Sequence, residues 1–178
     1  LIWTSLTVAD DGRIDFGALQ SPILLRGDKT TAYRDPTAVY HDGVFYVYFT
    51  MVRTEEADRI YSYTAFSQST NLQDWSPPRI ITPKGQKLNY SSPGNVVRFG
   101  DQWIMCLQTY PRPGYQRGGA VRWADQTARI FLMRSNDLIH WGEPELLRVK
   151  GPDVVVEDMG RMIDPYLIED KDETGKWW

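Results

Sequence analysis

One pattern of short apolar segments and turns occurs twice in this chain and begins a third time, and this repeat constrains the fold more than any other feature. In the first copy, apolar segments at 37–40 and 44–50 flank an Asp-Gly turn at 42–43. This arrangement is typical of a β-hairpin, because glycine accepts the positive φ that a tight two-residue turn requires. A third strand is expected at 60–67 and a fourth near 79–81.

The second copy follows the same order with different side chains. Its expected strands are residues 93–99, 102–110, 128–134 and 146–148. A third copy begins at residues 163–169 and turns through residues 172–175. No apolar period of 3.6 residues persists anywhere in the chain, so helices should be scarce.

Each complete copy carries the same heptad, Ser-x-x-Leu-x-x-Trp, after its third strand, at residues 69–75 and 135–141. The corner residues that begin the three copies, Asp35, Ser92 and Asp164, lie 57 and 72 residues apart. Four short antiparallel strands repeated at such a spacing are typical of the blades of a β-propeller. A β-sandwich also has many short strands, but it does not predict a fixed heptad after every third strand.

The repeat therefore predicts an all-β fold, a propeller of four-stranded antiparallel blades. Blade 1 covers about residues 33–83, blade 2 about residues 90–150, and blade 3 begins near residue 161. Two blades and the first hairpin of a third cannot close a ring. We therefore expect the chain to be the N-terminal part of one catalytic propeller domain, with about two more blades in a missing segment or a second chain.

Composition excludes several classes of partner. The net charge is -3 without basic runs, which argues against nucleic acid. No apolar run approaches the roughly 20 residues that a membrane span needs. Cys106 is the only cysteine, so no internal disulfide can form. The chain begins at Leu1 without a methionine, which fits a processed secreted or periplasmic protein and equally a trimmed chain.

Propeller geometry places the three corners together. The first strand of each blade lies against the central channel, so Asp35, Ser92 and Asp164 should surround one mouth of it. The loops at 51–59 and 110–127 should border the same mouth. So should the connections between blades, at residues 83–92 and 150–163.

The loop at residues 110–127 is long, and long ordered loops in compact domains are usually functional. It carries Tyr115, Trp123 and three arginines. Aromatic faces stack on sugar rings, and arginine offers forked donors to hydroxyls or carboxylates. A mobile surface loop and an oligomer contact are the alternatives.

Asp35 and Asp164 each precede a proline and an apolar segment. An aspartate before proline usually has a structural role, because it caps a turn while proline fixes φ. Two such aspartates at equivalent corners that face one channel instead favour a pair of carboxylates that act on a ligand.

These motifs resemble the five-bladed β-propeller glycoside hydrolases, most closely glycoside hydrolase family 43 and its relatives. The resemblance rests on Tyr33-Arg34-Asp35-Pro36, the Asp42-Gly43 hairpin, the two heptads and Ile163-Asp164-Pro165, and it extends from about residue 21 to the end. It implies that Asp35 is the general base. It also implies that Asp164 modulates the pKa of the general acid and orients it. That acid is a glutamate on the following blade, and no residue of this chain matches it.

An inverting glycosidase needs an acid on one face of the sugar and a base with its water on the other, roughly 6.5–9.5 Å apart. Separate blades around a channel can hold two such groups. The residues expected to contact substrate are Arg34, Ser92, Asn95, Gln108, Tyr115, Trp123 and Arg161. Glu157 is expected on the rim, and His41 and His140 fall away from the mouth, so no metal site is expected.

The resemblance implies cleavage of plant-type poly- or oligosaccharides that contain arabinose or xylose, so carbohydrate is the expected partner. No cofactor is expected, although the resemblance leaves room for a structural calcium ion in the channel. One alternative is a retaining enzyme similar to the fructan hydrolases. The chain has no Asn-Asp-Pro motif upstream of Arg34-Asp35-Pro36, which argues against it. The other alternative is a glycan-binding propeller without catalysis.

Overall fold

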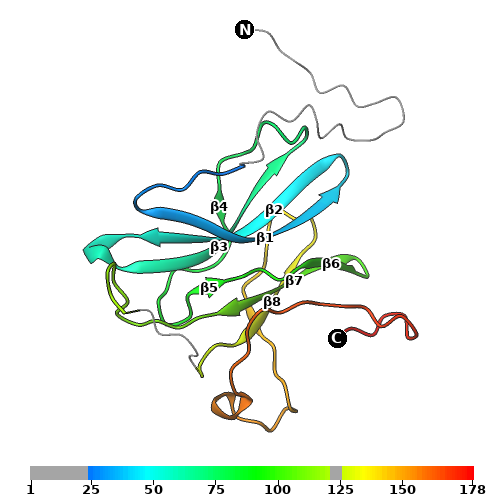
Figure 1. The fold of residues 1–178 in the computed structure, drawn as a ribbon. Helices are drawn as coiled ribbons and strands as arrows, with labels where there is room; N and C mark the ends of the chain where they lie inside the picture. The colour runs from blue at the N-terminus through cyan, green and yellow to red at the C-terminus, as the bar shows by residue number, and fades with distance from the viewer. Residues whose placement is uncertain (1–23, 121–125) are drawn as a thin grey trace, which may run out of the picture.

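The computed structural model describes residues 24–120 and 126–178, which form two antiparallel sheets (Figure 1). The first sheet consists, in order, of β1 (Thr31–His41), β2 (Val44–Thr54), β3 (Ile60–Ser69) and β4 (Arg79–Ile80). In the second, β5 (Tyr90–Ser91) and β6 (Val96–Phe99) both pair with β7 (Gln102–Thr109), which is followed by β8 (Ile130–Ser135) and β9 (Glu145–Leu146).

Helix is almost absent, as the sequence predicts. Within the described ranges the helical elements are two short 3-10 turns, η2 (Glu56–Asp58) and η3 (Val156–Met159). No helix in those ranges is long and apolar enough to cross a membrane. The all-β prediction is confirmed.

The first hairpin has the predicted turn but longer strands. Asp42 and Gly43 have φ values of 48° and 79°, both in the left-handed region that a two-residue hairpin turn requires. Strand β1 continues back through the corner to Thr31, and pairing with β2 shifts register between Arg34 and Thr37. The prediction of a first strand that starts after the corner is therefore wrong. The backbone on both sides of the corner pairs with β2, so Asp35 and Pro36 form a bulge within one strand.

The loop predicted at residues 51–59 is correspondingly shorter. Strand β2 runs to Thr54, and Met51 is buried rather than part of a polar loop. Residues 55–59 make the connection to β3. In the second sheet the interruption at the corner is wider, and the innermost strand is divided into β5 and β6.

The three corners share an unusual backbone conformation. Asp35, Ser92 and Asp164 have φ values of 53°, 44° and 52°, in the left-handed region that residues with a Cβ rarely adopt. The third copy therefore begins with the same local geometry as the two complete ones.

The heptads are capped turns that follow β3 and β8. The hydroxyls of Ser69 and Ser135 each accept a hydrogen bond from the backbone N–H of the leucine three residues later, both at 2.9 Å. The indole N–H of the final tryptophan donates to the carbonyl of the same leucine, at 3.1 Å in the first heptad and 3.3 Å in the second. Serine, leucine and tryptophan recur because each makes one defined contact in this turn.

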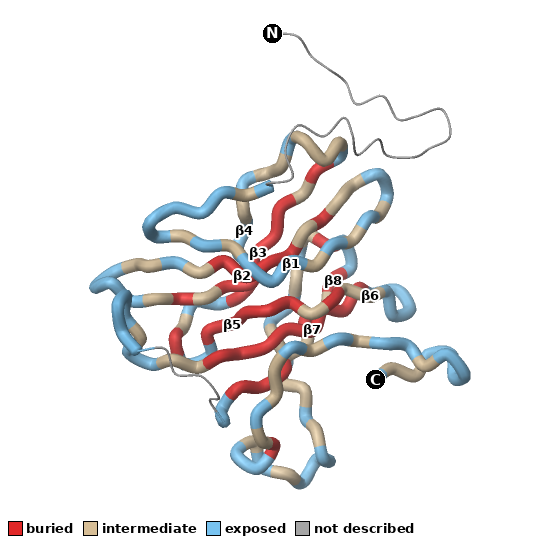
Figure 2. Tube along the Cα trace, in the orientation of Figure 1, coloured by how far each residue is buried: buried red, intermediate tan, exposed pale blue. Residues whose placement is uncertain are grey.

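The main core lies between the two sheets. It contains Tyr46, Tyr48 and Phe66 from the first sheet and Trp103, Met105 and Leu138 from the second part of the chain. Figure 2 shows buried residues concentrated on β2, β3 and β7. Tyr48 is fully buried, and its hydroxyl donates to the carbonyl of Leu138 at 2.6 Å. Burial raises the pKa of Tyr48, so this donor keeps its proton.

The start of the third copy packs against the second sheet. The side-chain amide of Asn95 donates to the carbonyl of Leu167 and accepts from its N–H, both at 2.8 Å, and so replaces a pair of strand hydrogen bonds. Gly94 lies so close to the carbonyl of Pro165 that a Cβ would overlap it. Ile168 and Trp178 then exchange two backbone hydrogen bonds across the predicted turn.

Candidate active site

The three corners line one pocket of about 340 Å³. Asp35 comes from β1, Ser92 from the gap between β5 and β6, and Asp164 from the start of the third copy. Residues that are up to 129 positions apart in sequence thus meet at one site, because each blade contributes the same position of its innermost strand.

Three donors from both sheets fix the carboxylate of Asp35. Its Oδ2 accepts from Arg34 Nε at 2.8 Å, from Thr50 Oγ1 at 3.1 Å and from Ser92 Oγ at 3.1 Å. Thr50 is fully buried on β2, and its hydroxyl oxygen also accepts from the N–H of Ser92 at 2.6 Å. All three donors bond to Oδ2, and Oδ1 has no partner among the described residues. Oδ1 therefore remains available to a water or ligand.

Asp164 is positioned through its backbone. Its N–H donates to Gln108 Oε1 at 2.7 Å, and Gln108 is itself buried on β7. The amide oxygen of Gln108 thus holds the third corner in place. Asp164 lines the pocket and is an exposed residue.

The first part of the long loop is fixed to the opposite sheet. Gln86 Nε2 donates to the carbonyls of Ile60 and Tyr115, at 2.8 and 2.7 Å, and Gln86 Oε1 accepts from Gly114 N at 3.0 Å. The guanidinium of Arg112 lies 4.4 Å from the ring centre of Tyr110 and 5.2 Å from that of Tyr115. Residues 110–120 are therefore an attached segment at the pocket, and the mobile-loop alternative does not describe them.

Arg129 anchors the segment that leads to Asp164. This arginine is 6% exposed, and its guanidinium donates only to backbone carbonyls. Its bonds go to Val156 at 2.7 and 3.1 Å, to Gly160 at 2.7 Å, to Ala128 at 2.9 Å and to Gln126 at 2.6 Å. The N–H of Met162 also donates to the carbonyl of Ala128 at 3.1 Å. Arg161, between Gly160 and Met162, is held beside Asp164.

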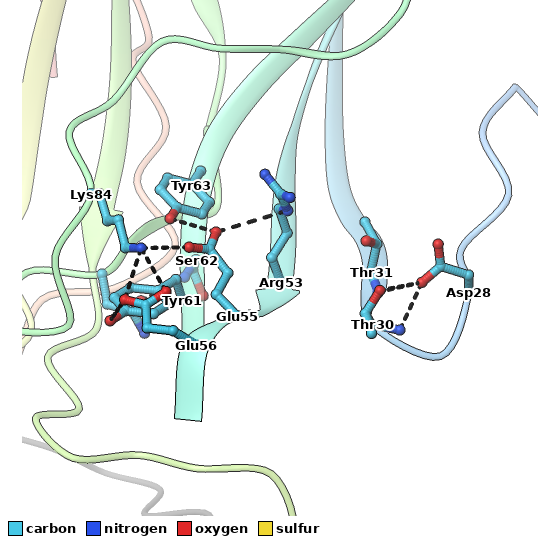
Figure 3. Close-up of polar contacts among 11 residues, drawn as sticks. Asp28, Thr30, Thr31, Arg53, Glu55, Glu56, Tyr61, Ser62, Tyr63 and Lys84 are labelled. Carbon is cyan, nitrogen blue, oxygen red and sulfur yellow. Dashed lines mark hydrogen bonds and ion pairs between the residues drawn. The ribbon is translucent and has the colours of Figure 1, made fainter. Parts of the chain in front are cut away.

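A group of ionisable side chains braces the connection between the blades (Figure 3). Lys84 Nζ lies 2.6 Å from Glu55 and 3.0 Å from Glu56, and the hydroxyl of Tyr63 donates to Glu55 at 2.8 Å. Burial acts to raise the pKa of Glu55, but the hydrogen bonds from Lys84 and Tyr63 outweigh it and lower the pKa. The hydrogen bonds of Lys84 to Glu55 and Glu56 raise the pKa of Lys84. None of these residues lines the pocket.

The structure brings most of the residues expected at the site into this pocket. They are Arg34, Asp35, Ser92, Gln108, Tyr115, Arg161 and Asp164. Asn95 does not line it, because its amide is paired with Leu167. Trp123 lies outside the described residues. Glu157 is exposed on η3 and does not line the pocket.

The two histidines lie elsewhere. The ring of His41 makes an edge contact with Trp103, and His140 Nδ1 lies 2.7 Å from the carboxylate of Asp137. Across residues 24–120 and 126–178, no group of three or more His, Cys, Asp or Glu side chains is arranged to hold a metal ion.

Five further polar residues of the pocket were not singled out by the sequence. They are Ser62, Asn89, Ser91, Tyr110 and Arg112. Asn89 lies on the connection expected at the rim, and its Oδ1 accepts from the N–H of Ser62 at 2.6 Å. Arg112 belongs to the arginine-rich loop. The positions of these segments were predictable, but only the folded chain selects which of their side chains reach the pocket.

The architecture is that of the five-bladed β-propeller glycoside hydrolases, and the prediction of a partial propeller is confirmed. The arabinanase of Bacillus subtilis matches with a TM-score of 0.53 at 16% identity, over 85% of this chain and 47% of that one. The family 43 endo-arabinanase of Bacillus licheniformis matches with a TM-score of 0.51 at 18% identity, over 83% of this chain and 46% of that one.

A third solved structure, the family 32 β-fructofuranosidase of Bombyx mori, matches with a TM-score of 0.50 at 21% identity, over 84% of this chain and 29% of that one. This chain thus spans less than half the length of these three proteins. Comparison with protein-family models gives no match, and comparison with curated protein sequences gives none either. At these identities the likeness establishes the fold.

Proposed function

We propose that this chain forms part of an inverting glycoside hydrolase in which Asp35 is the general base. The observation that carries this proposal is that Asp35 and Asp164 occupy equivalent corners of two blades and line the same pocket. Asp35 is held by Arg34, Thr50 and Ser92 on one oxygen, which leaves the other for a water molecule. The glycosidases among the solved structures of the same fold support this assignment.

In this mechanism, Asp35 Oδ1 takes a proton from the water that attacks the anomeric carbon. The general acid protonates the leaving oxygen on the opposite face of the sugar. We assign that role to a glutamate outside these 178 residues. Asp164 acts on this glutamate, because a nearby carboxylate disfavours its ionised form and so keeps the acid protonated.

The substrate class in this proposal is a poly- or oligosaccharide that contains arabinose or xylose. Sugar hydroxyls need neutral donors and acceptors, which Ser62, Asn89 and Gln108 supply in the pocket. Tyr115 adds an aromatic surface for the apolar face of a sugar ring.

The test is Asp35→Asn in the complete protein, assayed on aryl arabinofuranosides and aryl xylosides. Asparagine keeps the shape but cannot take the proton, so kcat should fall about 10²- to 10⁴-fold. Asp42→Asn is the matched control, because Asp42 lies at the tip of the same hairpin with a similar left-handed φ. An Asp35→Asn variant as active as this control would overturn the proposal.

The anomeric configuration of the first product, followed by NMR, separates the alternatives. Inversion agrees with a water activated by Asp35. Retention would instead favour an enzyme similar to the fructan hydrolases, in which a carboxylate forms a covalent intermediate. Saccharide binding with no turnover by the complete protein would favour a glycan-binding propeller.

A further inference from the structure

We propose that the substrate of this pocket carries an anionic substituent, a carboxylate or a sulfate ester, and that Arg112 and Arg161 bind it. This inference rests on the proposed function and specifies its substrate class. Three arginines and two aspartates line the pocket, an excess of one positive charge, although the whole chain carries a net charge of -3.

The charge of Arg34 is already compensated. Its Nε lies 2.8 Å from Asp35 Oδ2, so it serves the carboxylate assigned as the base. Arg161 is in a different position, since it forms no ion pair with any residue of the described ranges. A ligand anion can therefore approach its guanidinium without displacing a carboxylate of residues 24–120 or 126–178.

The backbone of Arg161 is fixed on both sides. The preceding carbonyl, of Gly160, accepts from Arg129 at 2.7 Å, and the following N–H, of Met162, donates to Ala128 at 3.1 Å. A buried arginine with no carboxylate partner thus holds another arginine at the edge of the pocket. Such a fixed attachment reduces the conformational entropy that Arg161 loses when it binds a ligand.

Arg112 is oriented by its aromatic neighbours. Its guanidinium lies 4.4 Å from the ring centre of Tyr110 and 5.2 Å from that of Tyr115, and its backbone N–H donates to Gln86 at 2.8 Å. Contact with aromatic faces engages the flat surface of a guanidinium, whereas its donors point outward in the plane. An in-plane fork of this kind fits the two oxygens of a carboxylate or sulfate.

A neutral sugar does not need these two cations. Its hydroxyls are served by uncharged groups, and the pocket already contains Ser62, Asn89 and Gln108 for them. Asp35 and Asp164 repel an anion, so an anionic substituent can bind in this pocket only where Arg112 and Arg161 outweigh that repulsion.

Isothermal titration calorimetry on the protein tests this with three methyl glycosides: a xyloside, a glucuronoside and a glucoside 6-sulfate. The xyloside and the glucuronoside share one ring and differ by the carboxylate on C5. We expect an acidic glycoside to bind about 10- to 100-fold more tightly than the xyloside, as charged hydrogen bonds allow. Arg161→Ala should remove most of that preference, and Arg161→Lys should restore part of it.

Arg98→Ala is the matched control. Arg98 also lies over an aromatic ring, 5.3 Å from the centre of Trp103, but on β6 and outside the pocket. A preference for the glucuronoside identifies a uronate as the source of the anion, and a preference for the sulfated glucoside identifies a sulfate ester.

Equal affinity for neutral and acidic glycosides overturns this inference and leaves the proposed function intact. A preference for acidic glycosides that persists in both Arg161→Ala and Arg112→Ala also overturns this inference. If arabino- and xylo-oligosaccharides also fail to bind and are not cleaved, the proposed function is overturned together with it.

Discussion

The two blades share a backbone plan but differ in the side chains at repeated positions. Both corners have a left-handed residue before proline, Asp35 in blade 1 and Ser92 in blade 2. The blade 2 residue donates its hydroxyl to the carboxylate of the blade 1 residue at 3.1 Å. One corner thus provides a carboxylate and the other helps to hold it. The repeat preserves a position, and the side chain at that position decides its chemical role.

The heptads show the same relation. Asn71 Oδ1 accepts from two backbone N–H groups in blade 1, and Asp137 Oδ1 does so at the equivalent place in blade 2. The other end of each side chain reaches the sixth heptad residue, Asp74 at 2.9 Å and His140 at 2.7 Å. In blade 1 the amide of Asn71 bonds to the carboxylate of Asp74, whereas in blade 2 the carboxylate of Asp137 bonds to the imidazole of His140. Only the second heptad therefore depends on an ionised side chain at its third position.

The largest expected difference concerns the arginine directly before the third strand of each blade. Arg59 is exposed, whereas Arg129 is buried and bonded to carbonyls. Arg129→Met should lower the free energy of unfolding by about 3 kcal/mol, because each buried carbonyl left unpaired costs about 1–3 kcal/mol. Arg59→Met should cost less than about 0.5 kcal/mol. Urea denaturation of both variants measures the contrast, and equal losses would contradict it.

A smaller effect is expected at Gly94, where blade 2 meets the third copy. Gly94→Ala places a Cβ on the carbonyl of Pro165, so the two segments must separate. We expect a loss of about 1–3 kcal/mol in the free energy of unfolding, as for other overpacked sites. Gly85→Ala is the control, because a Cβ there meets nothing within 4 Å and its φ is not positive. Thermal unfolding of both variants measures the difference, and an equal change in Tm would contradict it.

The smallest effect concerns the second heptad and pH. Hydrogen bonds from the side chain and the backbone N–H of His140 hold the pKa of Asp137 well below its usual value of 3.8. A lowered pKa in the folded state stabilises the protein above pH 3.8, and this contribution is lost as the pH falls further. In the Asp137→Asn variant, the free energy of unfolding should therefore fall less steeply as the pH is lowered. Asp137 is half exposed, so the change should stay below about 1 kcal/mol.

The measurement is Tm at about pH 7 and about pH 3 for the unchanged protein and the variant. Asp101→Asn, in the exposed turn of the same blade, provides the control for loss of one carboxylate. If the two variants show the same pH dependence, the bond between Asp137 and His140 does not contribute to stability.

The strand repeat and the turns were predictable because their causes are local. Asp42-Gly43 forms its turn from the conformational freedom of two residues, and each heptad closes through contacts within seven residues. The sequence underestimated β1 and β2, since pairing across the sheet extended them through the corner at Asp35. Asn95 shows that a long-range contact can also take a side chain away from the predicted site. It was expected to contact sugar, but it pairs with Leu167, 72 residues away.

The sequence by itself determined the all-β plan, the two complete repeats and the approximate place of the pocket, because turn and strand preferences act over a few neighbouring residues. It also placed Asp35 and Asp164 at equivalent corners. Only the tertiary structure decided that Ser92 and Thr50 hold Asp35, that Gln108 fixes Asp164, and that a buried Arg129 supports Arg161. Those contacts join segments far apart in the chain, and their geometry is set by how the two sheets pack.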